Sequence, residues 1–373
     1  MKTRILVIAA IVAMLAAIWL ASTRSPQSSG IEGGALAPGL GSQLDQVTQV
    51  RITGAGNTVL ATLQRDGSGQ WKLLEKGGYP VDVEKLRSLL SAIALAQKIE
   101  PKTALPERHA QLGVEDIAAA DAHGVQVDID AGSHQVAIVF GDNVVRGSGT
   151  YVRHAAEDQS WLVGNNIAVE RNPANWLARE LIDIGANRID AIRVQPVEGP
   201  VIELVRSAEA NAASDFAFVE LPRGREPAEG YTREALAGVL SGLSFEDVFT
   251  LDEMPEPEAI QEARFSLRDG RRLTLRSWQQ DERTFARLSM ALDEAAAQAW
   301  IDARTELAAD EAEVSATGED GVAPEEAAAE TLESLAAQVA AFEQVHQDRV
   351  YVLPLYKASN LNKGLEDYLK LKE

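Results

Sequence analysis

The sequence predicts an α+β protein: an N-terminal transmembrane helix, then two tandem duplicated β-rich domains with packed helices, the second with a helical-hairpin insertion. Three observations carry this prediction. Two parts of the chain resemble each other in order, the first twenty residues are almost wholly apolar, and an Ala/Glu-rich stretch occurs only in the second half. The chain has 373 residues, 46% of them hydrophobic, which is enough for more than one core.

The internal similarity is spread over a long unit. Three pairs of segments match in the same order: 47–52 with 189–194, 59–63 with 201–205, and 79–99 with 231–249. A repeat of this length indicates two similar domains rather than a short-period solenoid. We therefore predict a membrane anchor, a spacer, two repeat domains and an acidic insertion, with the bounds 1–24, 25–44, 45–186, 187–373 and, inside the second repeat, 293–345.

The N-terminus predicts the location. Residues 5–20 are wholly apolar, they follow Lys2 and Arg4, and the next charge is Arg24. This length is at the lower limit for a membrane-spanning helix. A cleaved signal peptide is the alternative, but small residues are poorly placed for cleavage, with Trp19 and Leu15 in the critical positions. We expect a single inner-membrane anchor and a periplasmic bulk, because basic residues stay on the cytoplasmic side. The Ser/Gly/Pro-rich residues after it favour a flexible spacer.

The first repeat reads as strands around a helix. Asp82 is a suitable N-cap, Val81 before it and Leu86 after it form a hydrophobic staple, and a second helix is expected to begin at Pro173 and run through Trp176 and Ile182. The apolar face of the first helix is Leu86, Leu89, Leu90 and Ile93. Strands are predicted at 47–53, 58–65, 70–75, 125–129, 136–140, 150–154 and 160–163.

The second repeat follows the same order. Thr232 is the predicted cap of its helix, with Tyr231 and Leu236 as the staple, and a closing helix is expected at 362–369. Asp269-Gly270 is a strong hairpin signal. Strands are predicted at 189–194, 201–206, 216–221, 263–267, 273–277, 284–290 and 350–353.

The insertion is strongly acidic and helical. Residues 293–343 hold fourteen Asp/Glu and one Arg, a net charge of −13 out of −21 for the chain. Helices are predicted at 293–310 and 324–345, with a loop at 314–322. Apolar residues recur at spacings of three and four along the second helix, which suits one partner helix. These residues are a candidate partner-docking seam, with a solvated projection as the alternative: Leu332, Leu335, Val339 and Phe342.

Four aromatic residues occupy matching strand positions in the two repeats. Trp71 corresponds to Phe216, and Trp161 corresponds to Tyr351. Core packing is the ordinary role of such residues. The alternative is an aromatic-lined groove between the repeats, because clefts between domains commonly bind ligands.

No catalytic, cofactor or metal signature stands out. The chain has no cysteine, and its five histidines include no pair at helical spacing, although His123, His134 and His154 could meet on one sheet face. Asp128 starts a calcium-like run, but Ser133 and Val139 stand where glycine and glutamate are needed, so we interpret it as a hairpin turn. There is no P-loop, no dinucleotide fingerprint and no nucleophile elbow. We expect no enzyme activity and no cofactor.

The charge excludes some partners. A net charge of −21 argues against binding nucleic acid, which requires clustered Lys and Arg. It also argues against adhesion to an anionic lipid surface.

The pattern resembles the DUF4340 family of bacterial envelope proteins. The residues that carry the resemblance are Trp71-Lys72-Leu73, Tyr79-Pro80-Val81-Asp82, Leu112-Gly113-Val114, Gly149-Thr150-Tyr151-Val152 and Trp161-Leu162-Val163. The resemblance covers roughly residues 45–290 and its motifs are structural. It implies a single-anchor protein that accompanies ABC transporter components of the gliding-motility type.

These observations lead to one expected function and two alternatives. We expect a non-enzymatic accessory subunit of an envelope ABC-type transport system, which docks on permease, ATPase or other envelope subunits or holds a substrate. An envelope hydrolase that cleaves peptidoglycan or glycan through paired carboxylates is the first alternative. A passive structural tether is the second.

Overall fold

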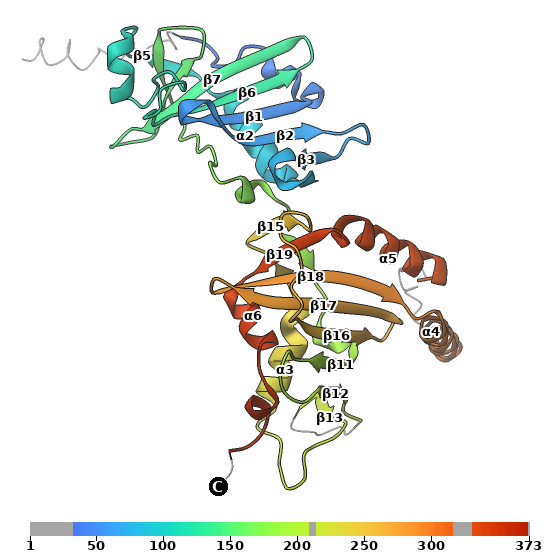
Figure 1. Cartoon of the computed structure of the whole chain (residues 1–373). Coiled ribbons are helices and arrows are strands. Elements are labelled where there is room, and N and C mark those ends of the chain that lie inside the picture. Colours follow the sequence, from blue (N-terminus) through green and yellow to red (C-terminus); the bar gives the residue numbers. More distant parts are fainter. Residues whose placement is uncertain (1–32, 209–213, 316–329, 372–373) are drawn as a thin grey trace, which may run out of the picture. The chain divides into compact units, whose positions relative to one another are not determined.

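The computed structural model describes residues 33–208, 214–315 and 330–371 (Figure 1). It is a mixed α/β structure dominated by two large antiparallel sheets. The chain divides into two compact units. Unit 1 holds the described residues up to Glu75 together with Val83–Trp176, and unit 2 holds Lys76–Asp82 together with the described residues from Leu177 onward.

Unit 1 is built on one antiparallel sheet. Its strands lie in the order β3-β2-β1-β6-β7-β8-β9-β5. Along β6, buried and half-buried residues alternate, as expected for a strand with one face on a core. The strands are β1 (Gln49–Gly54), β2 (Thr58–Arg65), β3 (Trp71–Leu73), β5 (Lys98–Pro101), β6 (Val125–Ala131), β7 (His134–Asn143), β8 (Thr150–His154) and β9 (Ser160–Val163). The predicted strands at 58–65, 150–154 and 160–163 have the observed bounds, and β5 was not predicted.

Two local predictions in unit 1 are confirmed. Helix α2 (Val83–Leu95) begins directly after Asp82, and its buried residues are Leu86, Leu89, Leu90 and Ile93. In Figure 1 it lies behind the strands β1–β3. The calcium-like run is a hairpin turn, because Ala131 pairs with His134 and Gly132 takes a positive φ of 71° between β6 and β7.

The Leu112-Gly113-Val114 segment covers part of the sheet of unit 1. Val114 is fully buried in a small cluster with Ile117, Ala122 and Val139. Arg153, 6% exposed, donates from Nε to the Val114 carbonyl oxygen at 2.8 Å, and its Nη1 donates to the carbonyl oxygens of residues 154, 155 and 157. Burial lowers the pKa of Arg153, partly offset by nearby acidic residues. Burial of this guanidinium is tolerated because its N–H groups donate hydrogen bonds to carbonyl oxygens.

Unit 2 contains a second sheet with the corresponding strand order, β13-β12-β11-β16-β17-β18-β19-β15. The short strands β10 (Glu180–Ile182) and β14 (Leu243–Ser244) pair with each other. The sheet strands are β11 (Ile189–Gln195), β12 (Ile202–Arg206), β13 (Phe216–Phe218), β15 (Asp247–Thr250), β16 (Gln261–Leu267), β17 (Arg271–Gln280), β18 (Arg283–Leu292) and β19 (Arg349–Leu353). Taken in chain order, each strand of this sheet has a counterpart at the same place in the sheet of unit 1.

The helix of unit 2 differs from the prediction at its start. Helix α3 (Tyr231–Ala237) is preceded by Gly230 as its N-cap, so Thr232 is a buried helical residue and not the cap. Tyr231 is 68% exposed, and therefore the predicted staple to Leu236 is wrong. Gly230 has no side chain that could accept a bond from the first turn of the helix, but glycine is a favoured residue at the N-cap position.

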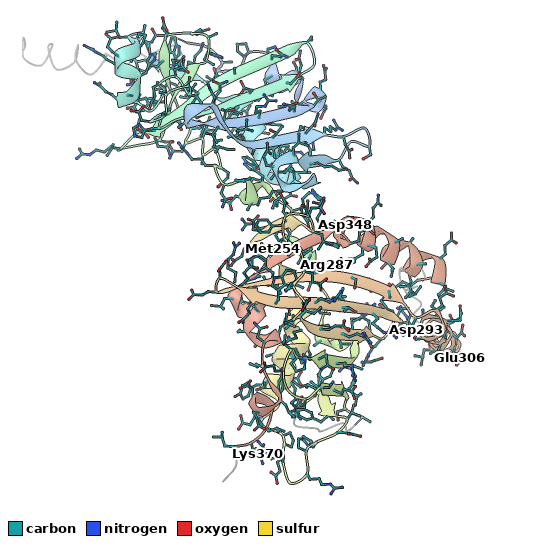
Figure 2. The ribbon with its side chains drawn as sticks, in the orientation of Figure 1. Met254, Arg287, Asp293, Glu306, Asp348 and Lys370 are labelled. Atoms are coloured by element: carbon teal, nitrogen blue, oxygen red, sulfur yellow. The ribbon has the colours of Figure 1, made fainter. Side chains whose placement is uncertain are left out.

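The insertion contains two helices in the β18–β19 connection (Figure 1). Asp293, labelled in Figure 2, precedes α4 (Glu294–Ser315) and accepts a bond from the Ala296 N–H at 3.1 Å. Helix α5 (Leu332–His346) begins at a capping box between Thr331 and Ser334, later than the predicted start at Pro324, which lies outside the described residues. Helix α4 continues into the predicted loop as far as Ser315, and residues 316–329 lie outside the described ones.

Two further helix predictions are wrong. Residues 173–176 form a short 3₁₀ turn, and the chain then extends, because Ala178 donates to the Pro80 carbonyl and β10 pairs with β14. Trp176 and Leu177 are both buried, so these apolar residues do not define one helical face. The C-terminal part has helix α6 (Leu355–Leu361) and a 3₁₀ turn (Leu365–Tyr368) in place of one helix at 362–369.

The predicted anchor lies in residues 1–24, outside the described part of the chain. Among the described residues, none of the helices combines the length and the apolar character that crossing a membrane requires.

Candidate functional site

A hollow of about 260 Å³ lies in unit 1, bounded by α2 and by residues at the ends of β2 and β3. Its walls are largely apolar and include the indole of Trp71, the first residue of β3. Val47, Leu86 and Leu90 are buried, whereas Trp71 is half-buried and Val83 is exposed. Small-molecule sites are typically concave and apolar with a few polar groups, and this volume is at the small end of their range.

Local structure places the apolar wall of this hollow. Leu86 and Leu90 are four residues apart on α2 and therefore lie on one face of the helix. The turn after β2 is held by Asp66, whose Oδ1 accepts bonds from the backbone N–H groups of Ser68 and Gln70 at 2.9 and 3.0 Å. This turn leads directly to Trp71.

Three charged residues line the same hollow. Arg65 donates from Nε to the Gly69 carbonyl at 3.2 Å and from a terminal nitrogen to the Asp45 carbonyl at 3.1 Å. Arg87 and Asp45 are exposed at its rim. In the described part of the chain, neither arginine forms an ion pair with a carboxylate. The hollow therefore joins apolar walls to two positive charges and one negative charge.

A larger hollow, of about 570 Å³, lies beside α4 in unit 2, but its arginines are already paired. Arg268 donates to Asp190 at 3.0 Å, and Arg272 lies 3.4 Å from Asp293. Arg271 and Arg188 both bind the fully buried carboxylate of Asp269 in the β16–β17 hairpin turn, at 2.7 and 2.8 Å. Burial would raise the pKa of Asp269, but Arg271 and Arg188 outweigh it and lower the pKa.

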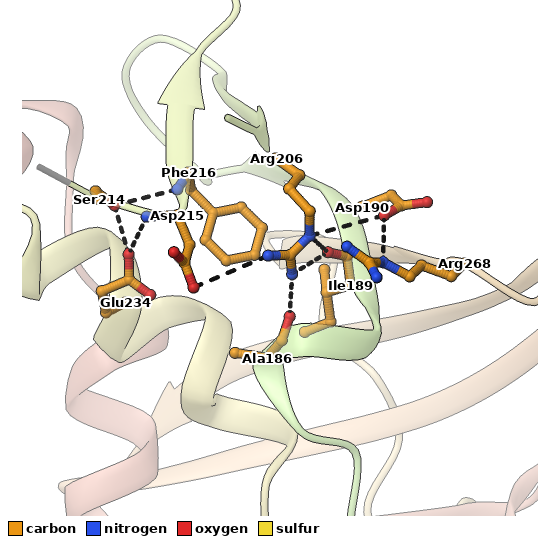
Figure 3. A network of polar contacts seen from close by, with 9 residues as sticks. All are labelled: Ala186, Ile189, Asp190, Arg206, Ser214, Asp215, Phe216, Glu234 and Arg268. Atoms are coloured by element: carbon orange, nitrogen blue, oxygen red, sulfur yellow. Dashed lines mark hydrogen bonds and ion pairs between the residues drawn. The ribbon is translucent and has the colours of Figure 1, made fainter. Parts of the chain in front are cut away.

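Arg206 lies 3.8 Å from Asp190, the partner of Arg268, in the polar network that Figure 3 shows. Its guanidinium donates to the carbonyl oxygens of Ile189 and Ala186 and lies over the ring of Phe216, with 4.9 Å between the guanidinium carbon and the ring centroid. Ser214 donates to Glu234 at 2.5 Å and accepts from the Phe216 N–H at 3.2 Å. These bonds tie the edge strand β13 to β11 and α3, so we assign the network a structural role.

A buried aromatic network lies elsewhere in unit 2. Tyr79 packs edge-on against Phe245, with ring centroids 5.2 Å apart, and Tyr351 is hydrogen-bonded to His346 Nδ1 at 2.5 Å. Burial lowers the pKa of His346 to about 4, helped by the charge of Arg349, so the ring is neutral at pH 7. Burial also raises the pKa of Tyr79 to about 12. This network fixes the segment Lys76–Asp82 within unit 2.

The four predicted aromatic residues do not form one group within either unit. In unit 1, Trp71 and Trp161 lie on β3 and β9, toward opposite ends of the sheet. In unit 2, Phe216 and Tyr351 lie on β13 and β19 and are fully buried. The predicted groove between the repeats stays a prediction, and only Trp71 lines one of the hollows described above.

The predicted docking seam lies on α5. Leu335 is fully buried, and Leu332, Val339 and Phe342 are half-buried. Part of this burial comes from unit 2 itself, because α5 packs on β18 and the Glu343 carboxylate accepts the Met290 N–H. As a surface for another protein, the seam stays a prediction.

The histidines of unit 1 each have a separate environment. His123 contacts Glu115 at 3.1 Å, and His154 contacts the Leu36 carbonyl at 2.9 Å. Within the described residues, no group of three His, Cys, Asp or Glu side chains is arranged to hold a metal ion.

A comparison with known protein families agrees with the resemblance to DUF4340 that the sequence motifs indicated. The model of a family described as "Domain of unknown function (DUF4340)" matches residues 71–259, half of the chain. The chain belongs to the DUF4340 family. No curated protein and no solved structure matches it. The DUF4340 match begins at Trp71 and includes the part of α2 that lines the hollow, while Asp45, Val47 and Arg65 precede it.

The sequence patterns singled out Trp71 and the apolar-face residues Leu86 and Leu90, but not the polar residues that line the same hollow. Arg87 and Ser91 looked like ordinary residues of a surface helix, and Arg65 looked like the end of a strand. Their common feature appears only when α2 packs on the sheet. The local indication that Arg87 lies near the hollow was its position on α2, directly after the apolar-face residue Leu86.

Proposed function

We propose that this DUF4340 protein is a membrane-anchored, non-enzymatic accessory subunit of an ABC-type transport system that holds a small substrate in the periplasm. The observation that carries the substrate-holding part is the Trp71 hollow, with apolar walls and two arginines that form no ion pair in the described chain. A site that binds without reacting needs only such walls and a few orienting polar groups.

The anchor and the transporter partner rest on other support. The apolar residues 5–20 after Lys2 and Arg4 support a single inner-membrane helix with a periplasmic bulk. Family membership supports the association with ABC permease and ATPase chains through the resemblance stated above. We also propose that the two units are copies of one duplicated unit, which their corresponding strand orders support.

Purification of the full chain from native membranes in mild detergent tests the partner assignment. Mass spectrometry is expected to find ABC permease and ATPase chains with the wild-type protein. A variant lacking residues 293–343 serves to locate the contact: loss of the partners places it on the insertion, and retention places it on another part of the chain. Recovery of no ABC chain, under conditions that preserve known transporter complexes, contradicts the proposed accessory role.

A further inference from the structure

The Trp71 hollow has a charge opposite to that of the chain as a whole. We propose that it selects a small ligand with an apolar body and one carboxylate, whose apolar part contacts Trp71 and whose carboxylate lies at Arg87 and Arg65. This inference rests on the proposed function and adds the chemical class of the substrate.

The apolar part of the ligand has a defined place. Leu86 and Leu90 present buried surface from α2, and the half-buried indole of Trp71 faces the same space. An apolar cavity of about 150 Å³ is large enough for a benzene ring. A hollow of about 260 Å³ therefore accepts one aromatic ring or a short aliphatic chain with its polar end, and excludes a large lipid.

The charges at the rim explain the preference for an anion. The carbonyls of Gly69 and Asp45 hold the Arg65 side chain without neutralising it. Arg87 is exposed and has no carboxylate partner in the described residues, so its guanidinium can donate two parallel bonds to a carboxylate. Asp45 opposes an anion, but the three charged residues together carry +1 in a chain of −21.

The other hollow provides the contrast. Beside α4, Arg268, Arg271 and Arg272 are each bound to an aspartate, so an entering anion would have to replace an existing partner. At the Trp71 hollow no such replacement is needed. For this reason the arginines of unit 1, and not the more numerous arginines of unit 2, are assigned to ligand binding.

The test compares three ligands that share a phenyl ring on a three-carbon chain and carry a negative, a neutral or a positive head group: phenylpropanoate, phenylpropanol and phenylpropylammonium. Calorimetric titration of the full chain in lipid nanodiscs, with empty nanodiscs as the blank, measures their affinities. Phenylpropanoate is expected to bind about fivefold more tightly than the alcohol, and the ammonium compound most weakly. Arg87→Gln is expected to abolish the difference between acid and alcohol, and Asp45→Asn to increase it.

Arg108→Gln is the matched control, because it removes the same charge from an exposed position outside the hollow. It is expected to leave all three affinities unchanged. Equal binding of the three ligands, or equal effects of the Arg87 and Arg108 variants, overturns the carboxylate assignment while a substrate-holding role survives. Absence of binding by all three at millimolar concentration overturns the ligand class, whereas the accessory role fails only if the transporter chains do not co-purify.

Discussion

Replacing Asp269 with alanine is expected to lower the free energy of unfolding of unit 2 by about 3 kcal/mol. The Asp269 carboxylate is fully buried and accepts bonds from Arg188, Arg271 and the Arg271 backbone N–H. Its removal leaves Arg271, whose side chain is only 15% exposed, without its counter-charge. Urea unfolding followed by hydrogen exchange of the β16 and β17 amides measures the change.

Asp190→Ala is the control for this prediction. Asp190 also pairs with arginines, Arg268 at 3.0 Å and Arg206 at 3.8 Å, but its side chain is 52% exposed. An exposed ion pair contributes less than about 1 kcal/mol, so this variant is expected to lose little stability. Equal losses in the two variants would show that burial of Asp269 is not what makes its ion pairs important.

Replacing Gly141 with alanine is expected to destabilise unit 1 by about 3 kcal/mol. A Cβ at this position of β7 would overlap the Leu112 carbonyl oxygen and lie 2.7 Å from Val114 Cγ1. The Asp142 N–H donates to the same carbonyl at 3.0 Å, so the Leu112-Gly113-Val114 segment cannot move away without losing this bond. Thermal unfolding, with hydrogen exchange of the β6 and β7 amides, measures the loss.

Gly164→Ala provides the comparison within unit 1. A Cβ at Gly164 meets no atom within 4 Å, so the substitution is expected to change the stability by less than about 0.5 kcal/mol. If Gly141→Ala is as mild as this control, the Leu112-Gly113-Val114 segment does not pack closely on β7.

The strands were predictable because their apolar alternation is local. Thr58–Arg65 and Ser160–Val163 have the predicted bounds, since a period of two together with turn residues defines a strand directly. The helix expected from Pro173 onward does not form, because the Ala178 N–H donates to the carbonyl oxygen of Pro80, which lies far earlier in the chain. A helical period cannot reveal such a competing partner. The predicted start of α3 was wrong because Gly230 is the N-cap residue, although Thr232 matched the sequence pattern of a cap.

The candidate site was less predictable than the fold. Trp71 was recognised as an aromatic residue at a strand position, but it was paired with Phe216, which is fully buried in unit 2. The site depends on the approach of Val47, Trp71 and Leu90, which lie far apart in sequence, and on the absence of an ion pair at Arg87. Neither property is encoded in a local pattern.

The most direct test of the central claim is to capture a small molecule on the full chain. The protein, reconstituted in lipid nanodiscs, is incubated with a small-molecule extract of the cell envelope, desalted and denatured, and the released compounds are identified by mass spectrometry. Ser91→Trp places an indole in the Trp71 hollow, and Ser133→Trp adds one at an exposed turn as the control. The account predicts a compound released from the wild type and the Ser133 variant but not from the Ser91 variant. Equal release from all three, or none from the wild type, would contradict it.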